Sequence, residues 1–403
     1  MQRAVALAAR GRGGVEPNPM VGCVLVRGGR IIGKGWHRRF GGPHAEIDAL
    51  RRCHGSPRGA TAYVTLEPCC YHGKTPPCTD ALLAAGIKRV VAAVRDPNPR
   101  VAGRGLRILR AGDVEVTLGV CGEQAAALNA PFFKFIRKHR PWVILKWAQS
   151  LDGKIATHTG DSKWISDEVC RAHAHRQRGL VDAIIVGIGT VLKDDPLLTS
   201  RVGGSAARRA SFSPTGRLGK PPRTATRVVL DSDLRIPLRA QLVRTAKQVP
   251  TWIFCGPSAP ATRVRRLEAA GCRVTRVPLA PFAPFSPFTR SHSSTAAHRR
   301  AGSLTPPTLS LPAVLDELGR AQMLNVLVEG GGRLLGEFMD AGLADELQVY
   351  IAPLLVGGAG APGPLHARGV ARVAEAQRVS QDSAQESATL RRLGEGWFMQ
   401  ARL

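Results

Sequence analysis

Two stretches of the sequence decide the fold of its first half: Pro43-His44-Ala45-Glu46 and Glu67-Pro68-Cys69-Cys70-Tyr71-His72-Gly73-Lys74-Thr75-Pro76-Pro77-Cys78. One imidazole and two thiolates can hold zinc while leaving its fourth tetrahedral position to water, which is the open arrangement of a catalytic site. Zinc lowers the pKa of such a water toward about 7. Glu46 follows the histidine by two residues and is then free to carry protons. The pattern therefore predicts a catalytic zinc centre.

The spacing of the two cysteines leaves the ligand set open. His-x-Glu followed by Pro-Cys and a second cysteine is the pattern of zinc-dependent nucleobase deaminases, in which the cysteines lie close together. Here eight residues separate Cys69 from Cys78, so either the loop between them bulges or Cys70 is the ligand. We favour Cys69 because a proline precedes it. A closed structural site with His72 as fourth ligand is the alternative, and it would leave Glu46 without a role.

Working outward from this motif, short apolar runs alternate with amphipathic runs up to residue 140, as in an α/β layer fold. A chain of 403 residues exceeds the usual size of one hydrophobic core, so we expect two domains. The basic stretch 134–140, ended by Pro141, predicts the boundary, with domains at 1–140 and 141–403; a solvated helix end is the alternative for this stretch. The predicted strands are 21–27, 30–36, 62–66, 88–94 and 113–118, and the predicted helices are 44–53, 79–85 and 123–138.

The alternation restarts at residue 142, and two segments interrupt it. Residues 203–222 are rich in Gly, Ser, Arg and Pro, and residues 280–312 contain Ala-Pro-Phe-Ala-Pro-Phe-Ser-Pro-Phe. Such compositions bury too little apolar surface to offset the entropy of ordering, so we predict mobile surface insertions. A docking motif made by the spaced phenylalanines is the alternative for the second segment. The predicted strands are 142–147, 181–188, 227–231, 251–255, 273–277, 324–329 and 346–351.

Composition narrows the class of protein further. The net charge of +27 would attract nucleic acid, but the arginines are scattered and aromatic residues make up only 5% of the chain, which favours an arginine-rich globular protein. Nine cysteines is an odd number, and their clustering beside histidines indicates metal binding in a reducing compartment. No run approaches the roughly 18 apolar residues of a membrane helix. We therefore expect a soluble, cytoplasmic protein without an export signal.

The motifs follow one another as they do in the bifunctional deaminase-reductases of riboflavin biosynthesis, which the sequence resembles over nearly its whole length outside the two insertions. The extended cysteine interval, ending Gly-Lys-Thr-Pro-Pro-Cys, is distinctive of that family. The resemblance implies an α/β protein of two domains: a cytidine-deaminase-like α/β/α layer fold, then a dihydrofolate-reductase-like mixed sheet flanked by helices. The other stretches that carry it here are Pro17-Asn18-Pro19-Met20-Val21-Gly22 and Asp96-Pro97-Asn98-Pro99 with Gly103-Arg104-Gly105.

For the first domain, the resemblance implies one zinc ion held by His44, Cys69 and Cys78, with Glu46 as general acid and base. The implied reaction is hydrolytic deamination of 2,5-diamino-6-(5-phosphoribosylamino)pyrimidin-4(3H)-one. Asn18 and His37 are candidate pocket residues. Cys70 and Tyr71 replace the usual Ser-His, which affects the detail of the pocket and not the ligand set.

For the second domain, the residues alone do not identify a cofactor site. Neither Gly187-Ile188-Gly189-Thr190 nor Gly330-Gly331-Gly332-Arg333 completes a dinucleotide-binding fingerprint, and tight turns would explain the glycines of both stretches. The resemblance rests here on Ser150-Leu151-Asp152-Gly153-Lys154, Ser162-Lys163-Trp164-Ile165 and Asp194-Asp195-Pro196-Leu197-Leu198-Thr199. It implies NADPH-dependent reduction of 5-amino-6-(5-phosphoribosylamino)uracil to its ribityl form. The implied NADPH contacts are Ala148, Trp164, Thr190, Asp194, Ser232, Gly331, Gly332, Arg333, Leu334, Leu335, Gly336 and Glu337. The implied substrate contacts are Lys146, Ser162, Arg178, Leu198, Arg201 and Glu329.

Two other functions compete with this interpretation. The charge and the zinc motif would also suit a deaminase acting on RNA or DNA, and the second half could be a binding module without catalysis. We expect a small phosphorylated pyrimidine as the partner, with neither nucleic acid nor a membrane, and a homo-oligomer is compatible with the sequence.

Overall fold

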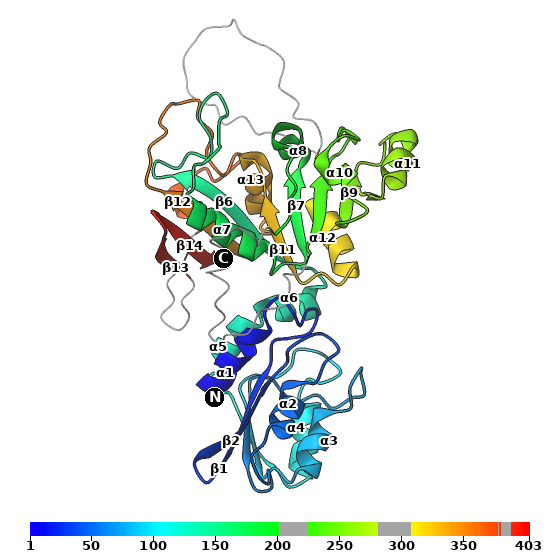
Figure 1. Ribbon diagram of the computed structural model, residues 1–403, viewed down its shortest axis with the longest axis vertical. Coiled ribbons are helices and arrows are strands. Elements are labelled where there is room, and N and C mark those ends of the chain that lie inside the picture. Colours follow the sequence, from blue (N-terminus) through cyan, green and yellow to red (C-terminus); the bar gives the residue numbers. More distant parts are fainter. Residues whose placement is uncertain (201–223, 281–307, 378, 380–387) are drawn as a thin grey trace, which may run out of the picture.

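The computed structural model describes residues 1–200, 224–280, 308–377, 379 and 388–403, and within them it forms two separate sheets (Figure 1). Helices α5 (Gly122–Leu128) and α6 (Ala130–Lys138) lie between the two sheets. The predicted insertion 203–222 lies outside the described residues, and so does most of the predicted insertion 280–312. The expectation that both are mobile therefore stays a prediction.

The first sheet has five strands in the order β2-β1-β3-β4-β5. β1 pairs antiparallel with both β2 and β3, whereas β3, β4 and β5 run parallel. All five predicted strands of the first half are present, some shorter than predicted. Their bounds are β1 (Gly22–Arg27), β2 (Arg30–Trp36), β3 (Thr61–Val64), β4 (Arg89–Ala92) and β5 (Glu115–Leu118).

Helices cover both faces of this sheet. Neighbouring strand residues point to opposite faces, so Leu25 packs in the core beneath α2 (Ala45–Arg51), α3 (Cys78–Ala84) and α4 (Arg104–Ala111), while Val24 packs against α1 (Gln2–Ala8). α1 lies so close to β1 that a Cβ atom at Gly22 would come 2.0 Å from the carbonyl oxygen of Ala4. The result is the expected α/β/α layering. Neither α1 nor α4 was predicted.

The single helix predicted at 123–138 is wrong, because the chain forms two helices that meet at Asn129. The backbone of Asn129 leaves the helical region, with φ −104° and ψ 17°. Pro131 follows it near the start of α6 and has no N–H to donate to the preceding turn, so the helix cannot continue through this point.

The second sheet is mixed, with nine strands in the order β10-β9-β8-β7-β11-β6-β12-β14-β13. The first seven strands in this order are parallel to one another. The last two, β14 and β13, form an antiparallel hairpin at one edge of the sheet. The seven predicted strands are present, and the hairpin was not predicted. The bounds are β6 (Trp142–Ser150), β7 (Ala183–Gly187), β8 (Thr226–Leu230), β9 (Thr251–Cys255), β10 (Arg273–Arg276), β11 (Asn325–Glu329), β12 (Glu346–Ala352), β13 (Ala388–Leu393) and β14 (Gly396–Arg402).

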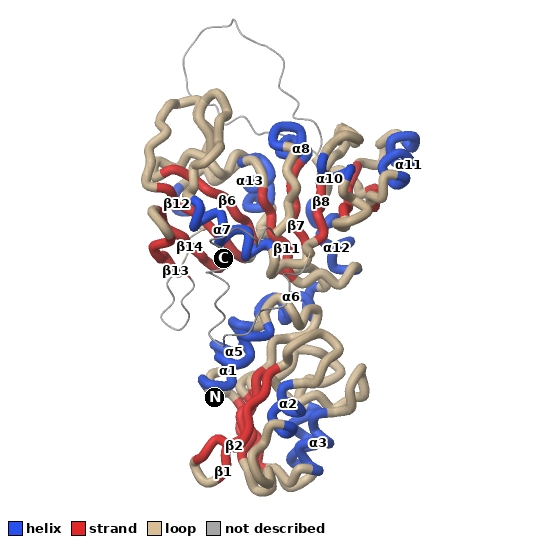
Figure 2. Tube along the Cα trace, in the orientation of Figure 1, coloured by secondary structure: helices blue, strands red, loops and turns tan. Residues whose placement is uncertain are grey.

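Helices flank the second sheet (Figure 2), and each of its faces has its own apolar core. α12 (Leu311–Arg320) and α13 (Gly332–Asp340) cover one face; α8 (Ile188–Asp194), α10 (Gln241–Arg244) and α11 (Ala261–Ala269) cover the other. The predicted insertion extended too far, since Leu309 is buried, bridges to Leu279, and is followed by Ser310, whose hydroxyl caps α12. Leu309 and Leu311 therefore belong to the core.

The C-terminal hairpin is tied to α7 (Glu168–Arg178) through the buried ring of His173. Its Nδ1 lies 2.8 Å from the hydroxyl of Tyr350 on β12, and its Nε2 lies 2.9 Å from a guanidinium nitrogen of Arg391 on β13. Burial, together with the positive charges of Arg391 and Arg176, lowers the pKa of His173 to about 4.

We expect this histidine to make the second domain less stable in acid. Its folded pKa is depressed below the unfolded value of about 6.5, so its contribution is complete above that value and is lost as pH falls toward 4. The expected loss is on the order of 2 kcal/mol. Urea unfolding of the wild type and of His173→Gln between pH 7 and 4 measures it, and an equally steep pH dependence in both proteins would contradict the assignment.

Candidate active sites

The first candidate site lies where two helices of the first domain begin. His44 precedes α2, Cys78 is the first residue of α3, and Cys69 lies in the loop after β3. The two Sγ atoms, of Cys69 and Cys78, lie 3.5 Å and 3.4 Å from Nδ1 of His44. All three potential ligand atoms lie within 4.8 Å of one another. The structure thus brings together the three residues that the sequence suggested as zinc ligands.

The long interval between the cysteines is a bulging loop that supports the cluster. The Oγ1 atom of Thr75, inside this loop, lies 3.3 Å from Nε2 of His44, which leaves Nδ1 facing the sulfur atoms. The backbone N–H of Cys78 donates to Sγ of Cys69 at 3.4 Å, and the N–H of Thr79 donates to the carbonyl of Cys69. Thr75 was not predicted, because a threonine in a Gly-Lys-Thr-Pro-Pro loop carries no recognisable metal-site pattern.

The two alternative ligands lie outside the cluster. Sγ of Cys70 is 3.7 Å from the carbonyl oxygen of Arg100, and neither Cys70 nor His72 belongs to the group of ligand atoms found among the described residues. One imidazole and two thiols are donors that zinc prefers, and three ligands leave one tetrahedral position open. Hydrogen bonds from Cys78 and His44 lower the pKa of Cys69, which favours the thiolate that a metal needs. The donor set therefore fits a catalytic zinc ion.

Glu46 and the candidate pocket residues lie beside these donors. Glu46 is buried in the first turn of α2 and hydrogen-bonds with Cys78, and burial raises its pKa to about 7. Nδ2 of Asn18 is 3.2 Å from Nε2 of His37, whose Nδ1 is 3.0 Å from the carbonyl oxygen of Pro43. The rings of His37 and His44 meet edge to face, with their centroids 5.3 Å apart. A carboxyl group at this position can exchange protons near neutral pH.

The buried carboxylate of Glu67 holds the loop that carries Cys69. It accepts hydrogen bonds from the backbone N–H groups of Asp96, Gly103 and Leu106, so it joins this loop to the start of α4. A Cβ atom at Gly105 would lie 2.1 Å from the carbonyl oxygen of Pro68. These contacts give the Gly103-Arg104-Gly105 motif a packing role behind the cluster.

The two adjacent cysteines allow a sharp test of the ligand set. We expect Cys69→Ser and Cys78→Ser each to lower bound zinc from about one ion per chain to near zero, because two ligands bind far more weakly than three. Cys70→Ser is the matched control and should keep its zinc. Elemental analysis of the purified proteins measures the metal content; loss of zinc from Cys70→Ser alone would transfer the ligand role to Cys70.

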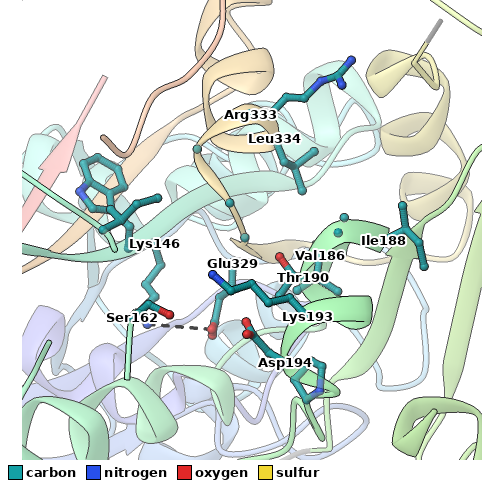
Figure 3. Close-up of a pocket in the computed structure, with 18 of the residues that line it drawn as sticks. Lys146, Ser162, Val186, Ile188, Thr190, Lys193, Asp194, Glu329, Arg333 and Leu334 are labelled. Atoms are coloured by element: carbon teal, nitrogen blue, oxygen red, sulfur yellow. Dashed lines mark ion pairs between the residues drawn. The ribbon is translucent and has the colours of Figure 1, made fainter. Parts of the chain in front are cut away.

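The second candidate site is a cavity of about 980 Å³ in the second domain (Figure 3). It lies at the carboxyl ends of four adjacent parallel strands, β8, β7, β11 and β6, where loops and helix starts supply its walls. Ligands of α/β proteins bind at this edge of a sheet.

An ion cluster occupies the β11 side of the cavity. Both oxygens of Glu329 accept hydrogen bonds of 2.7 Å from Arg178, and Nζ of Lys146 lies 3.9 Å from the same carboxylate. Figure 3 shows Lys146 extending from β6 toward Glu329. Burial opposes the charge of Glu329, but the two cations outweigh it and hold the pKa of Glu329 at about 2. The carboxylate therefore stays ionised across the physiological range.

Most of the residues that the sequence suggested for the reductase site line this cavity. Leu335 is instead fully buried in the core, and Gly336 packs against Ala367 on the far side of α13. Arg201 lies outside the described residues. Lys193 and Arg235 also line the cavity and were not predicted, since single basic residues do not stand out in so arginine-rich a chain. The predicted residues that line the cavity are Lys146, Ala148, Ser162, Trp164, Arg178, Thr190, Asp194, Leu198, Ser232, Glu329, Gly331, Gly332, Arg333, Leu334 and Glu337.

The fold and the two sites define a zinc-dependent deaminase domain joined to a dihydrofolate-reductase-like reductase domain. Residues 1–94 match the family model described as cytidine and deoxycytidylate deaminase zinc-binding region, and residues 141–387 match the RibD C-terminal domain. The chain belongs to the RibD family, the bifunctional deaminase-reductases of riboflavin biosynthesis, which bind zinc and NADPH.

Individual relatives cover nearly the whole chain. The riboflavin biosynthesis protein RibD of Actinobacillus pleuropneumoniae is 39% identical over 96% of this chain and 91% of its own length. The RibD of Escherichia coli (strain K12) is 39% identical over 89% of this chain and 88% of its own. A solved structure of Acinetobacter baumannii RibD, 32% identical, covers 100% of this chain and 97% of that chain with a TM-score of 0.76.

A second solved structure is that of a protein whose name gives both reactions. It is a diaminohydroxyphosphoribosylaminopyrimidine deaminase/5-amino-6-(5-phosphoribosylamino)uracil reductase from Thermotoga maritima, 32% identical, and it covers 100% of this chain and 97% of that chain with a TM-score of 0.75. Among the described residues, no helix combines the length and the apolar character needed to cross a bilayer.

Proposed function

We propose that this chain deaminates 2,5-diamino-6-(5-phosphoribosylamino)pyrimidin-4(3H)-one in its first domain and reduces the ribosyl chain of the product in its second. The observation that carries the proposal is the presence, in one chain, of an open His-Cys-Cys cluster beside Glu46 and of a large strand-end cavity containing a buried ion cluster. The Thermotoga maritima protein, named for these two activities, matches the chain over its full length.

In the deaminase half, His44, Cys69 and Cys78 would hold zinc. Bound there, zinc would supply a Lewis acid that lowers the pKa of water toward about 7. Glu46 would accept a proton at its carboxylate and donate it to the departing amine, because it is the buried carboxyl group next to the three ligands. Asn18 would hold the pyrimidine, with its amide oriented by the ring of His37.

In the reductase half, NADPH would supply the hydride. Thr190, Ser232 and the start of α13 from Gly331 would hold the cofactor, since backbone N–H groups at a helix start and hydroxyl groups suit its phosphates. The remaining residues proposed to contact it are Ala148, Trp164, Asp194, Gly332, Arg333, Leu334 and Glu337.

The ion cluster would orient the substrate at the other end of the cavity. The guanidinium of Arg178 uses two of its nitrogens on Glu329 and a third on the carbonyl oxygen of Thr199. Its main role would be to fix the Glu329 carboxylate, which would then accept hydrogen bonds from the sugar hydroxyls alongside Lys146. The remaining residues proposed to contact the substrate are Ser162, Leu198 and Arg201, the last from the sequence alone.

One assay tests both halves in order. Purified enzyme is incubated with the diamino substrate, and ammonia is measured before and after NADPH is added, with NADPH oxidation followed in parallel. We expect stoichiometric ammonia without NADPH, and NADPH oxidation only after deamination. Ammonia release without any subsequent NADPH oxidation would leave the second domain as a binding module.

The proposed partner is this small phosphorylated pyrimidine, and the proposed compartment is the cytoplasm. The net charge of +27 would instead favour a polynucleotide substrate. An enzyme of that kind would deaminate single-stranded RNA or DNA, and its binding would weaken steeply as the salt concentration is raised. Turnover of the small substrate and none of oligonucleotides would exclude that function.

A further inference from the structure

The linker between the domains carries a buried side chain that binds a segment next to the first active site. The first family match ends at residue 94 and the second begins at residue 141, so α5 and α6 lie outside both matches. Asn129 occupies the junction of these two helices and is 1% exposed. A buried amide requires hydrogen-bond partners. Nδ2 of Asn129 lies 3.5 Å from the carbonyl oxygen of Ala125 in α5, and the shorter hydrogen bonds of Asn129 reach a distant part of the chain.

Both ends of the Asn129 side chain bind the backbone of Met20. The N–H of Met20 donates to Oδ1 at 2.8 Å, and Nδ2 donates to the carbonyl oxygen of Met20 at 2.9 Å. The paired contacts fix the position and the orientation of this peptide segment. An aspartate at position 129 would keep the first hydrogen bond and lose the second, because a carboxylate has no N–H.

The segment that Asn129 holds continues directly into the deaminase pocket. On one side of Met20, the side chain of Asn18 contacts the ring of His37 at 3.2 Å. On the other side, the carbonyl oxygen of Val21 accepts the backbone N–H of His37 at 2.9 Å. Met20 therefore lies between the two points at which this segment holds His37.

The same linker is fixed to the second domain. Phe132 packs with Leu324 just before β11, and Lys134 forms an ion pair with Asp345 just before β12. Asp345 also accepts the N–H of Val143 at the start of β6. α6 is therefore held by the ends of three strands of the second sheet.

We infer that Asn129 is a positioning residue of the deaminase site: it holds the segment of Asn18 at the distance from His37 that substrate binding requires. The inference rests on the proposed deaminase function. It makes the linker a part of the first active site, and not only a connection between two independent enzymes.

The test compares Asn129→Asp and Asn129→Ser with Arg140→Gln. Arg140 lies in the same linker region and pairs with Asp316 of the second domain, away from the Met20 segment, so it is the matched control. Steady-state ammonia release gives KM and kcat for deamination, and supplied intermediate with NADPH gives the same constants for reduction. Zinc content and the thermal midpoint are measured on every protein.

We expect both Asn129 variants to raise KM for deamination about tenfold, with a smaller change in kcat, while zinc and both reductase constants stay within twofold of wild type. Arg140→Gln should match wild type in both reactions. A lower thermal midpoint with unchanged KM would mean that Asn129 is only structural and would overturn the inference. If wild type itself released no ammonia, the proposed function would fail instead.

Discussion

Replacement of Glu46 by glutamine should lower the rate of deamination about a thousandfold or more, while bound zinc and the reductase rate stay unchanged. The amide keeps the size of the side chain but can neither accept nor deliver the proton, and general acid–base catalysis contributes on the order of 10²- to 10⁴-fold. Ammonia release per zinc-loaded chain measures the loss. The burial of Glu46 beside Cys78 is the reason for expecting so large an effect from so small a change.

Asp48→Asn is a suitable control for this variant. It makes the same chemical change two residues later on α2, but Asp48 pairs with Arg38 and Arg52 and is not among the zinc donors. Its deamination rate should stay within a few fold of wild type. Loss of metal from Glu46→Gln would show that Glu46 is a ligand, and retained activity would remove it from proton transfer.

Replacement of Glu329 by alanine should lower kcat/KM for reduction at least about a hundredfold and leave deamination intact. It would leave the cations of Arg178 and Lys146 buried without their shared carboxylate, and breaking one side of a buried ion pair costs about 3–5 kcal/mol. NADPH oxidation with supplied intermediate, at a temperature where the variant remains folded, measures the effect on reduction.

A variant at a second buried carboxylate, Asp182, distinguishes a loss of stability from a loss of catalysis. Asp182 accepts the N–H groups of Leu324 and Asn325 at the opposite end of β11 from Glu329. Asp182→Ala should therefore destabilise the second domain but reduce its substrate normally while folded. If both variants lost reduction in proportion to their stability, Glu329 would have no role in the site.

The layers of both domains could be predicted from the sequence because buried strands appear as short apolar runs and the helices that cover them appear as amphipathic runs. Val24 and Leu25 point to opposite faces of one strand, and both faces are covered. The C-terminal hairpin was missed because β13 is an edge strand with four consecutive exposed residues, 389–392, so its pattern shows no buried face.

The candidate sites were predictable in proportion to how unusual their side chains are. His44, Cys69 and Cys78 form a rare combination whose spacing the sequence displays directly. Lys193 and Thr75 are ordinary residues that the fold alone brings to a site. Asn129 looked like part of a helix, and its function depends on a contact with Met20, 109 positions away in the sequence.

The aromatic side of α6 limits how this enzyme can be divided. Phe132, Phe133 and Phe135 are each less than one-tenth exposed, in a cluster that includes Leu324 from the other half. A protein cut at residue 140 would expose the part of this cluster that Leu324 covers, and the remaining half would lose the lysine opposite Asp345. Each half made alone would thus expose an apolar patch that promotes aggregation. An engineered stand-alone deaminase would need polar side chains on this side of α6 to stay in solution.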